Sequence, residues 1–243
     1  MIVREVQAKS ILNASKVYPY VINPYTGCQH GCSYCYARFM KRFTGHREPW
    51  GEFVDVKVNA VELLSREVVR KRPGRVWVSG VCDPYQPVEA QYRLTRGCLE
   101  VLAEQDWPVT VQTRSPLVLR DRDVFLRLKQ GEVGLTITTA DDDIRAILEP
   151  NAPPIAERAR ALAELHAAGI RTYVMIAPML PGAEGLPALL AGTVDRVLLD
   201  RLNYHYADRV YRENGLDDAL SDGFFVAMEA KLRAEFAAQG VPC

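Results

Sequence analysis

The sequence lacks any long apolar run, so no segment of its 243 residues reaches the length needed to cross a membrane. It also lacks the basic start and apolar core of a secretory signal, since the chain begins Met1-Ile2-Val3-Arg4-Glu5. Internal repeats and low-complexity tracts are absent as well, which excludes repeat arrays and compositionally biased linkers. We therefore expect a cytoplasmic globular protein that has no membrane partner.

The chain has no net charge, because 30 Lys and Arg balance 30 Asp and Glu. The charges are unevenly placed: residues 1–75 hold 13 basic and 6 acidic side chains, and residues 76–243 are acidic by the same margin. The basic cluster Arg38, Lys41, Arg42 and Arg47 could attract an anionic substrate or nucleic acid. Because aromatic residues do not alternate with the basic ones, we favour a solvated helix face with pairing between domains as the explanation. Because the surplus of basic residues in 1–75 is modest, we expect no tight binding to an undamaged nucleic-acid duplex at physiological salt.

Three of the six cysteines fall within eight residues, Cys28, Cys32 and Cys35, in the pattern C-x3-C-x2-C. A β-prone run at 17–22 precedes them and a helix-competent run at 36–43 follows. Gly27 and Gly31 allow the short loop between these runs to curl back on itself. Such a loop can direct three thiolates at one point, which suits an iron–sulfur cluster with one iron left open.

A structural zinc loop, with His30 as the fourth ligand, is the alternative interpretation of these cysteines. Zinc sites more often combine two C-x2-C pairs, or two Cys with two His. The sequence contains no second cysteine pair of this kind. The spacing therefore favours the iron–sulfur cluster, and a non-catalytic zinc- or iron–sulfur-binding module remains the alternative class of function.

The loop resembles the cluster motif of the radical S-adenosylmethionine (SAM) superfamily, in which an aromatic residue, here Tyr34, precedes the third cysteine. The resemblance implies that Cys28, Cys32 and Cys35 hold a [4Fe–4S] cluster and that SAM chelates the fourth iron. It also implies that one electron cleaves SAM into methionine and a 5′-deoxyadenosyl radical, which abstracts hydrogen from a substrate. The implied partner is an electron donor such as flavodoxin or ferredoxin.

Strand-like and helix-like segments alternate from residue 17 onward. Strands are predicted at 18–23, 75–79, 108–112, 133–138, 171–176 and 193–199, and helices at 36–43, 60–71, 94–105, 122–129, 155–168, 186–192 and 223–239. This alternation implies an α/β fold with parallel strands and right-handed crossovers. Six units are too few for a closed eight-fold barrel, so we predict a partial, open (β/α)6 TIM-like barrel over residues 1–200. Residues 201–243 should form a C-terminal helical cover packed on the same domain, and residues 44–58 an insertion.

Further segments resemble the spore photoproduct lyase-like branch of the superfamily. They are Gly80-Val81-Cys82-Asp83-Pro84-Tyr85-Gln86-Pro87-Val88-Glu89, Arg114-Ser115-Pro116-Leu117-Val118-Leu119-Arg120-Asp121, Leu148-Glu149-Pro150-Asn151-Ala152-Pro153 and Ala177-Pro178-Met179-Leu180-Pro181-Gly182. The resemblance covers residues 21 to 200 and supports SAM chemistry. It leaves the substrate open: a nucleic-acid lesion in DNA or RNA, a nucleoside, another small molecule, or a partner protein that the enzyme matures.

Candidate site residues follow the predicted strands, because chemistry in parallel α/β folds gathers at strand ends. For binding SAM the candidates are Ser79, Gly80, Arg114, Ser115, Thr136, Thr138, Glu149 and Ala177. The resemblance implies that the strand edge at Ser79 and Gly80 meets the amino group of SAM. Arg114 stands where the family more often has Lys, so it keeps the charge but leaves its exact contact open. The threonine hydroxyls and Glu149 would reach the ribose, and the edge at Ala177 the adenine.

The catalytic candidates are Cys82, Asp83, Tyr204 and His205. Asp83 is held by flanking prolines and could face a cationic ligand. Cys82 is a potential hydrogen-atom donor, although packing is the commoner role of a cysteine of this kind. Tyr204 and His205 follow the last predicted strand and could grip a substrate.

Overall fold

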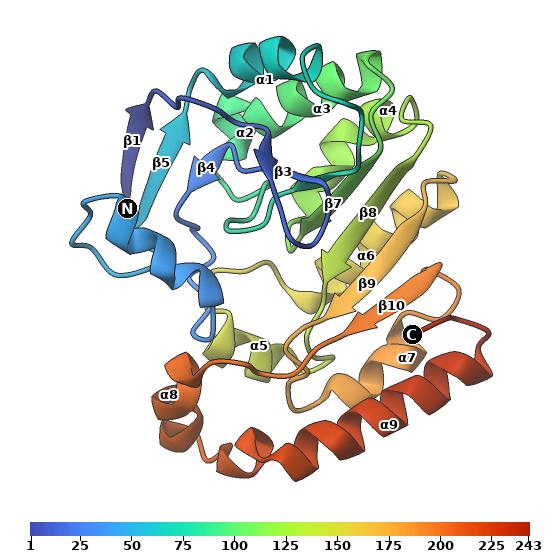
Figure 1. The fold of residues 1–243 in the computed structure, drawn as a ribbon. Helices are drawn as coiled ribbons and strands as arrows, with labels where there is room; N and C mark the ends of the chain where they lie inside the picture. The colour runs from blue at the N-terminus through green and yellow to red at the C-terminus, as the bar shows by residue number, and fades with distance from the viewer. The chain divides into compact units, whose positions relative to one another are not determined.

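The computed structural model describes residues 1–243, which form two compact units. Unit 1 contains residues Met1–His30 and Ala37–Val133, and unit 2 contains Gly31–Tyr36 and Gly134–Cys243. The chain therefore changes unit inside the cysteine loop and again within strand β8, Gly131–Thr136. Each unit contains both strands and helices (Figure 1). The cysteine loop is divided between the two units.

The main sheet of unit 1 is built on three parallel strands, β3 (Tyr20–Ile22), β6 (Val76–Val78) and β7 (Val109–Thr113). A short strand β2 (Asn13–Ala14) pairs antiparallel with β3. The register places Ile22, Val78 and Val111 side by side, and all three are fully buried. Helices α1 (Ala60–Val68), α2 (Glu89–Tyr92), α3 (Leu94–Glu104) and α4 (Arg122–Phe125), with the 3-10 helices η1 (Tyr36–Phe43) and η2 (Pro116–Asp121), complete the unit.

A second sheet in unit 1 includes part of the segment 44–58, which was predicted to be an insertion. Strand β5 (Phe53–Lys57) lies at its centre, parallel to β1 (Ile2–Val6) and antiparallel to β4 (Tyr25–Thr26). The β1 pattern did not reveal a strand because its first four residues are exposed on both faces. Arg4 and Asp55 are paired in the register, and Arg4 Nε lies 2.8 Å from Asp55 Oδ1.

Unit 2 contains strands β8, β9 (Thr172–Ile176) and β10 (Arg196–Leu199), in the order β10-β9-β8, with β9 and β10 parallel. Helices α5 (Asp142–Leu148), α6 (Ile155–Ala167) and α7 (Leu186–Leu189) and the 3-10 helix η3 (Ala183–Gly185) connect them. At Gly134 in β8, the Tyr173 ring of β9 occupies the space that a side chain would need. A Cβ atom there would lie 2.1 Å from the Tyr173 ring.

The C-terminal segment of unit 2 contains η4 (His205–Ala207), α8 (Asp208–Glu213), η5 (Asp217–Leu220) and the long helix α9 (Asp222–Ala238). Helix α9 buries one stripe, Phe225, Met228, Leu232 and Phe236, and it packs on α7, η3 and η5 (Figure 1). Beyond the helix, Val197 N donates to Pro242 O at 2.8 Å, so the tail covers the edge of β10.

All six predicted strands are confirmed within a few residues, as are the seven predicted helices. The helix ends shift most: the segment predicted at 186–192 is α7 over four residues, and 122–129 is α4 over four. No helix is long and apolar enough to span a membrane.

Candidate functional site

The first part of the cysteine loop leaves β4 and passes close to β5. Gly27 has a φ of +91°, and a Cβ atom there would lie 2.3 Å from the carbonyl oxygen of Phe53. Only glycine tolerates both this dihedral angle and this approach. Cys28 follows directly and is buried, with 8% of its surface exposed. The glycine before the first cysteine is therefore required by the local geometry.

The backbone on both sides of Cys28 is held by glutamine side chains. The fully buried Gln86 accepts a hydrogen bond from Gln29 N at 2.9 Å and donates to Gly27 O at 3.2 Å. In return, Gln29 Oε1 accepts from Val88 N at 2.6 Å. The segment 83–88, whose sequence resembled a family motif, thus clamps the start of the cysteine loop within unit 1.

Asp83, a predicted catalytic residue, belongs to the same segment 83–88. Its carboxylate accepts from Thr113 Oγ1 at 2.6 Å, Arg114 N at 2.7 Å and Tyr85 N at 2.8 Å, and His30 Nε2 lies 3.3 Å from Oδ2. Burial alone would raise the pKa of Asp83, but the neighbouring His30 and the hydrogen bonds from His30, Thr113 and Arg114 N lower it to about 2. Asp83 therefore stays ionised and anchors the loop through His30.

Replacing Asp83 with asparagine should lower the free energy of unfolding by about 2 kcal/mol at neutral pH, since lowering its pKa in the folded state stabilises that state. The folded pKa lies below the unfolded one, so this stabilisation is complete above about pH 5 and is lost as the pH falls towards about 2. Urea denaturation of both proteins across this range should give curves that converge in acid. A difference that stays constant with pH would show that ionisation of Asp83 contributes nothing.

Asn23 organises the strand end after β6, where Ser79 and Gly80 were predicted to bind SAM. Its side-chain oxygen accepts from Ser79 Oγ at 2.6 Å, Gly80 N at 2.9 Å and Val81 N at 3.0 Å. Cys82 lies beside this turn, with Sγ 3.0 Å from Ser79 Oγ and donating to Tyr25 O at 3.3 Å. Burial raises the pKa of Cys82 to about 11, so the thiol keeps its proton at neutral pH.

A buried ionic network centred on Glu89 directly follows the segment 83–88. Glu89 accepts from Tyr25 OH, from Thr95 N at 3.0 Å and from Arg120 Nη2 at 2.6 Å. Arg120 Nε also reaches Asp121 at 2.8 Å. Because every charge in this network has partners of opposite sign, Glu89 serves the structure of unit 1, in agreement with the interpretation from the sequence.

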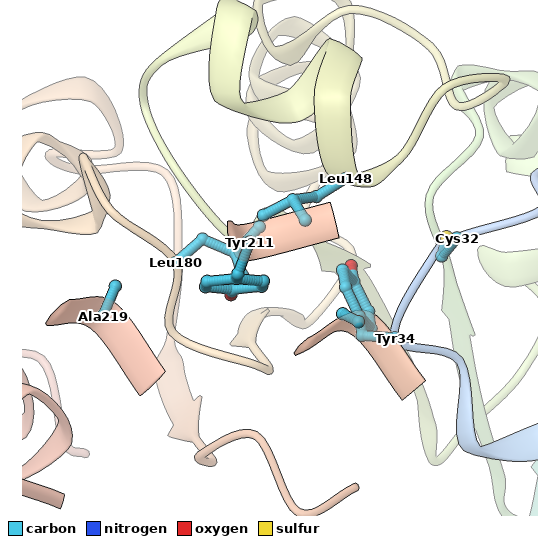
Figure 2. Close-up of a cluster of buried hydrophobic side chains, with 7 residues drawn as sticks. Cys32, Tyr34, Leu148, Leu180, Tyr211 and Ala219 are labelled. Atoms are coloured by element: carbon cyan, nitrogen blue, oxygen red, sulfur yellow. The ribbon is translucent and has the colours of Figure 1, made fainter. Parts of the chain in front are cut away.

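The second part of the cysteine loop is built into unit 2. Cys32 and Tyr34 belong to a buried cluster with Leu148, Leu180 and Tyr211, in which the Tyr34 and Tyr211 rings lie near each other (Figure 2). The backbone is fixed as well, because Ser33 N donates to Leu148 O at 2.9 Å. Cys35 is half-buried at the edge of the same cluster.

Glu149, predicted to contact the SAM ribose, lies at the centre of a buried network in unit 2. It accepts from Tyr34 OH and from Thr138 Oγ1 at 2.9 Å, and its Oε2 lies 2.6 Å from Arg158 Nη1. Arg158 also donates to Pro153 O at 2.8 Å and to Thr136 O at 3.2 Å. Both charged side chains are fully buried. The network therefore ties the cysteine loop, through Tyr34, to the segment 148–153.

The other predicted SAM-binding residues occupy strand ends. Ser115 caps η2, with its hydroxyl accepting from Leu117 N at 3.3 Å, and the backbone N–H of Arg114 binds Asp83. Thr136 is the last residue of β8, and Ala177 directly follows β9. Their roles toward SAM stay predictions.

Tyr204 and His205 lie on an aromatic surface of unit 2. The Tyr204 ring stacks on Tyr206, with centroids 5.7 Å apart, and on Tyr36, with centroids 6.3 Å apart. All three rings are more than 40% exposed. His205 is also exposed, and its Nδ1 lies 3.1 Å from Asp208 Oδ2.

Beside this tyrosine column lies a cavity of about 650 Å³. Its polar lining includes Arg201, Asn203, Tyr204, His205, Asp208 and Asp222. The lining thus combines two aromatic side chains, Tyr204 and Phe225, with hydrogen-bonding groups of both charge signs, which suits a polar ligand.

Sequence reasoning missed Asn23, Gln86 and Arg158 as site residues. Gln86 lay inside a recognised motif, but its amide gave no sign that it would bind the cysteine loop. Arg158 carried a clearer signal, since it occupies a position on the buried stripe of α6 formed by Ile155, Leu162 and Leu165. A lone arginine on such a stripe needs a buried carboxylate partner.

The sequence model of the Radical SAM superfamily matches residues 22–184, which include the three cysteines and extend past Gly182. An uncharacterised protein of Methanocaldococcus jannaschii is 37% identical over 179 residues, which cover 73% of this chain and 67% of that protein. The protein named Radical SAM Nalpha-GlyT isomerase, from Pseudomonas phage M6, is 27% identical over 161 residues, or 65% of this chain and 33% of that protein.

Among solved structures, a spore photoproduct lyase variant with bound AdoMet and dinucleoside spore photoproduct superimposes with a TM-score of 0.72 at 17% identity. The match covers 99% of this chain and 80% of that one. The fold is thus the α/β partial TIM-like barrel of radical SAM enzymes, as predicted. Fold, cysteine loop and sequence match agree, and the chain belongs to the radical SAM superfamily.

Proposed function

We propose that this protein cleaves SAM reductively at a [4Fe–4S] cluster held by Cys28, Cys32 and Cys35. The observation that carries the proposal is the C-x3-C-x2-C loop, which lies within the residues that match the radical SAM family model. Each part of the loop is held within its own unit: Gln86 and Asp83 hold residues 27–30 in unit 1, and Glu149 and Leu148 O hold residues 33–34 in unit 2. Three thiols at this spacing in one short loop fit a cluster with one open iron. A cluster held there would supply the electron that cleaves SAM into methionine and a 5′-deoxyadenosyl radical, which would abstract hydrogen from substrate.

In the proposed reaction, the residues of this chain bind the cluster and SAM, orient them and shield them from water. Cys28 and Cys32 are buried, so their surroundings exclude water from two of the three proposed ligands. Asp83 and Glu149 act as positioning residues, because their carboxylates are already engaged by the groups that hold the loop. We therefore assign the contacts with SAM to the remaining strand-end candidates, above all Arg114, Thr136 and the turn at Ser79-Gly80.

For the substrate we propose a small molecule or nucleic-acid-derived compound that contains a planar ring. The support is the column formed by Tyr36, Tyr204 and Tyr206, whose exposed rings offer stacking surfaces. His205 and Asn203, beside the column, supply hydrogen-bonding groups. The bound dinucleoside spore photoproduct in the spore photoproduct lyase structure supports this class by similarity of fold.

Anaerobic reconstitution with iron and sulfide tests the proposal. The protein should retain about four irons and four sulfides per chain, as the cluster type requires. It should also form 5′-deoxyadenosine from SAM when dithionite is added. Retention of zinc without sulfide, and no 5′-deoxyadenosine, would instead establish the non-catalytic metal-binding module.

A prediction within this function concerns Cys82 as a hydrogen-atom donor to the substrate radical. Its protonated thiol, half-buried beside Ser79, carries the S–H bond that this role requires. Cys82→Ala should still cleave SAM at the wild-type rate but should release altered product. The measurement is product analysis by mass spectrometry, with deuterium incorporation from D2O followed at the product carbon.

Cys82→Thr is the matched control, since it keeps the volume and a hydrogen bond but has no thiol. Cys82 also packs against the cluster formed by Tyr25, Val54, Val56, Val88 and Leu94, so a packing role makes a different prediction. Unchanged product and turnover in both variants would show that Cys82 only packs.

A further inference from the structure

The 3-10 helix η1 presents an exposed surface that the proposed chemistry does not use. Phe39 is 38% exposed and Phe43 is 66% exposed. Between them lies Arg42, whose guanidinium carbon is 5.5 Å from the Phe39 centroid and 4.6 Å from the Phe43 centroid. We call Phe39, Lys41, Arg42, Phe43 and Arg47 the η1 patch.

The cations of the η1 patch have no carboxylate partner. Lys41 Nζ donates to the carbonyl oxygen of Arg47 at 2.9 Å, Arg42 rests on the two phenylalanine rings, and Arg47 makes no salt bridge. The nearby carboxylates of Glu48 and Asp55 point to His46, at 3.0 and 2.9 Å. The patch therefore keeps a surplus of positive charge that it does not neutralise itself.

The composition of the η1 patch is that of a protein interface. Phenylalanine and arginine, which make up four of its five residues, are enriched at the centre of interfaces relative to other surfaces. Arginine is also among the residues that contribute most to binding energy. Because Arg42 already covers one side of each phenylalanine ring, the rings offer less stacking area to nucleobases than bare aromatic side chains would. The observations favour an acidic protein over a nucleic acid.

The position of the η1 patch in the chain identifies the kind of protein. Phe39 follows the third cysteine, Cys35, by four residues, and four residues of chain span at most about 14 Å. A protein seated on Phe39 and Arg42 is thus beside the cluster loop. The proposed reaction takes up one electron for each SAM cleaved, and this electron must be delivered by another molecule.

We infer that the η1 patch is the docking surface for an acidic one-electron carrier protein, an inference that rests on the proposed function. The carrier would place carboxylates against Lys41, Arg42 and Arg47 and apolar atoms against the two phenylalanines. Charge complementarity of this kind raises the rate of association and makes it sensitive to salt.

The test compares Arg42→Glu with wild type, using two sources of electrons. With an acidic flavodoxin kept reduced by its reductase, kcat/KM for the flavodoxin in 5′-deoxyadenosine formation should fall about tenfold or more. With dithionite the two proteins should react equally fast, because no docking is needed. Raising the salt should slow the flavodoxin-driven reaction of wild type and change that of the variant far less. Arg66→Glu, an exposed arginine of α1 paired with Glu62, is the control and should keep the wild-type rate with both donors.

The outcomes separate this inference from the proposed function. No 5′-deoxyadenosine from wild type with dithionite would refute the function itself. Activity with dithionite, combined with equal flavodoxin-driven rates in wild type and Arg42→Glu, would overturn the docking surface alone. A wild-type protein that reacts with dithionite but with neither flavodoxin nor ferredoxin would also overturn the docking surface. Binding of a single-stranded oligonucleotide that Arg42→Glu abolishes, without any change in donor kinetics, would assign the patch to nucleic acid and also overturn the inference.

Discussion

Replacing any one of Cys28, Cys32 or Cys35 with alanine should reduce 5′-deoxyadenosine formation to the level seen without enzyme. All three thiolates are needed, because they would be the only protein ligands of the proposed cluster. The measurement is 5′-deoxyadenosine released after anaerobic reconstitution, with iron and sulfide content determined on the same samples. The iron content reports on the cluster independently of activity, so a loaded but inactive variant is distinguishable from one that never bound the cluster.

The matched control is Cys98→Ala. Cys98 is fully buried in α3, so this variant removes the same thiol from the interior of unit 1 without touching the loop. It should bind the cluster and cleave SAM like wild type. Undiminished SAM cleavage by any of the three loop variants would refute the assignment of the ligands.

The fold was largely predictable from the sequence because its central strands are short, apolar and separated by helices with clear periodicity. The second sheet of unit 1 was not, because β1 is exposed and β4 has only two residues. Neither strand buries an alternating face by itself, and each is defined by its pairing with β5. Pairing between distant segments leaves no trace in the local pattern.

The candidate site, like the fold, could be predicted only in part from the sequence. The cysteine spacing alone indicated the ligands, because three soft donors in eight residues constrain the chemistry strongly. What holds the loop could not be predicted, since Gln86 is 57 residues from Gln29 and Glu149 is 115 residues from Tyr34. Sequence reasoning placed Glu149 after a short helix, with the SAM ribose or a neighbouring helix end as its partner, and it had no means of pairing this carboxylate with Arg158.

That buried pair leads to the second large effect expected from this structure. Arg158→Met should lower the free energy of unfolding by about 3–5 kcal/mol, because the Glu149 carboxylate would stay buried without its cation. For a chain of this size the loss corresponds to a fall in Tm of roughly 6–20 °C. Differential scanning calorimetry of the unreconstituted protein measures it directly. Arg160→Ala on the same helix is the control: Arg160 and Glu164 are exposed and 3.7 Å apart, so it should cost at most about 1 kcal/mol.

A double substitution decides whether the pair stabilises the fold or specifies the position of the loop. Glu149→Leu combined with Arg158→Met removes both charges, so most of the stability lost in Arg158→Met should return. The hydrogen bond from Tyr34 OH to Glu149 would still be missing, and with it the tie between the cysteine loop and the segment 148–153. We therefore expect the double variant to melt near the wild-type temperature yet to retain less iron after reconstitution. Full recovery of both stability and iron content would mean that Ser33 N and the packing of Tyr34 hold the loop without Glu149.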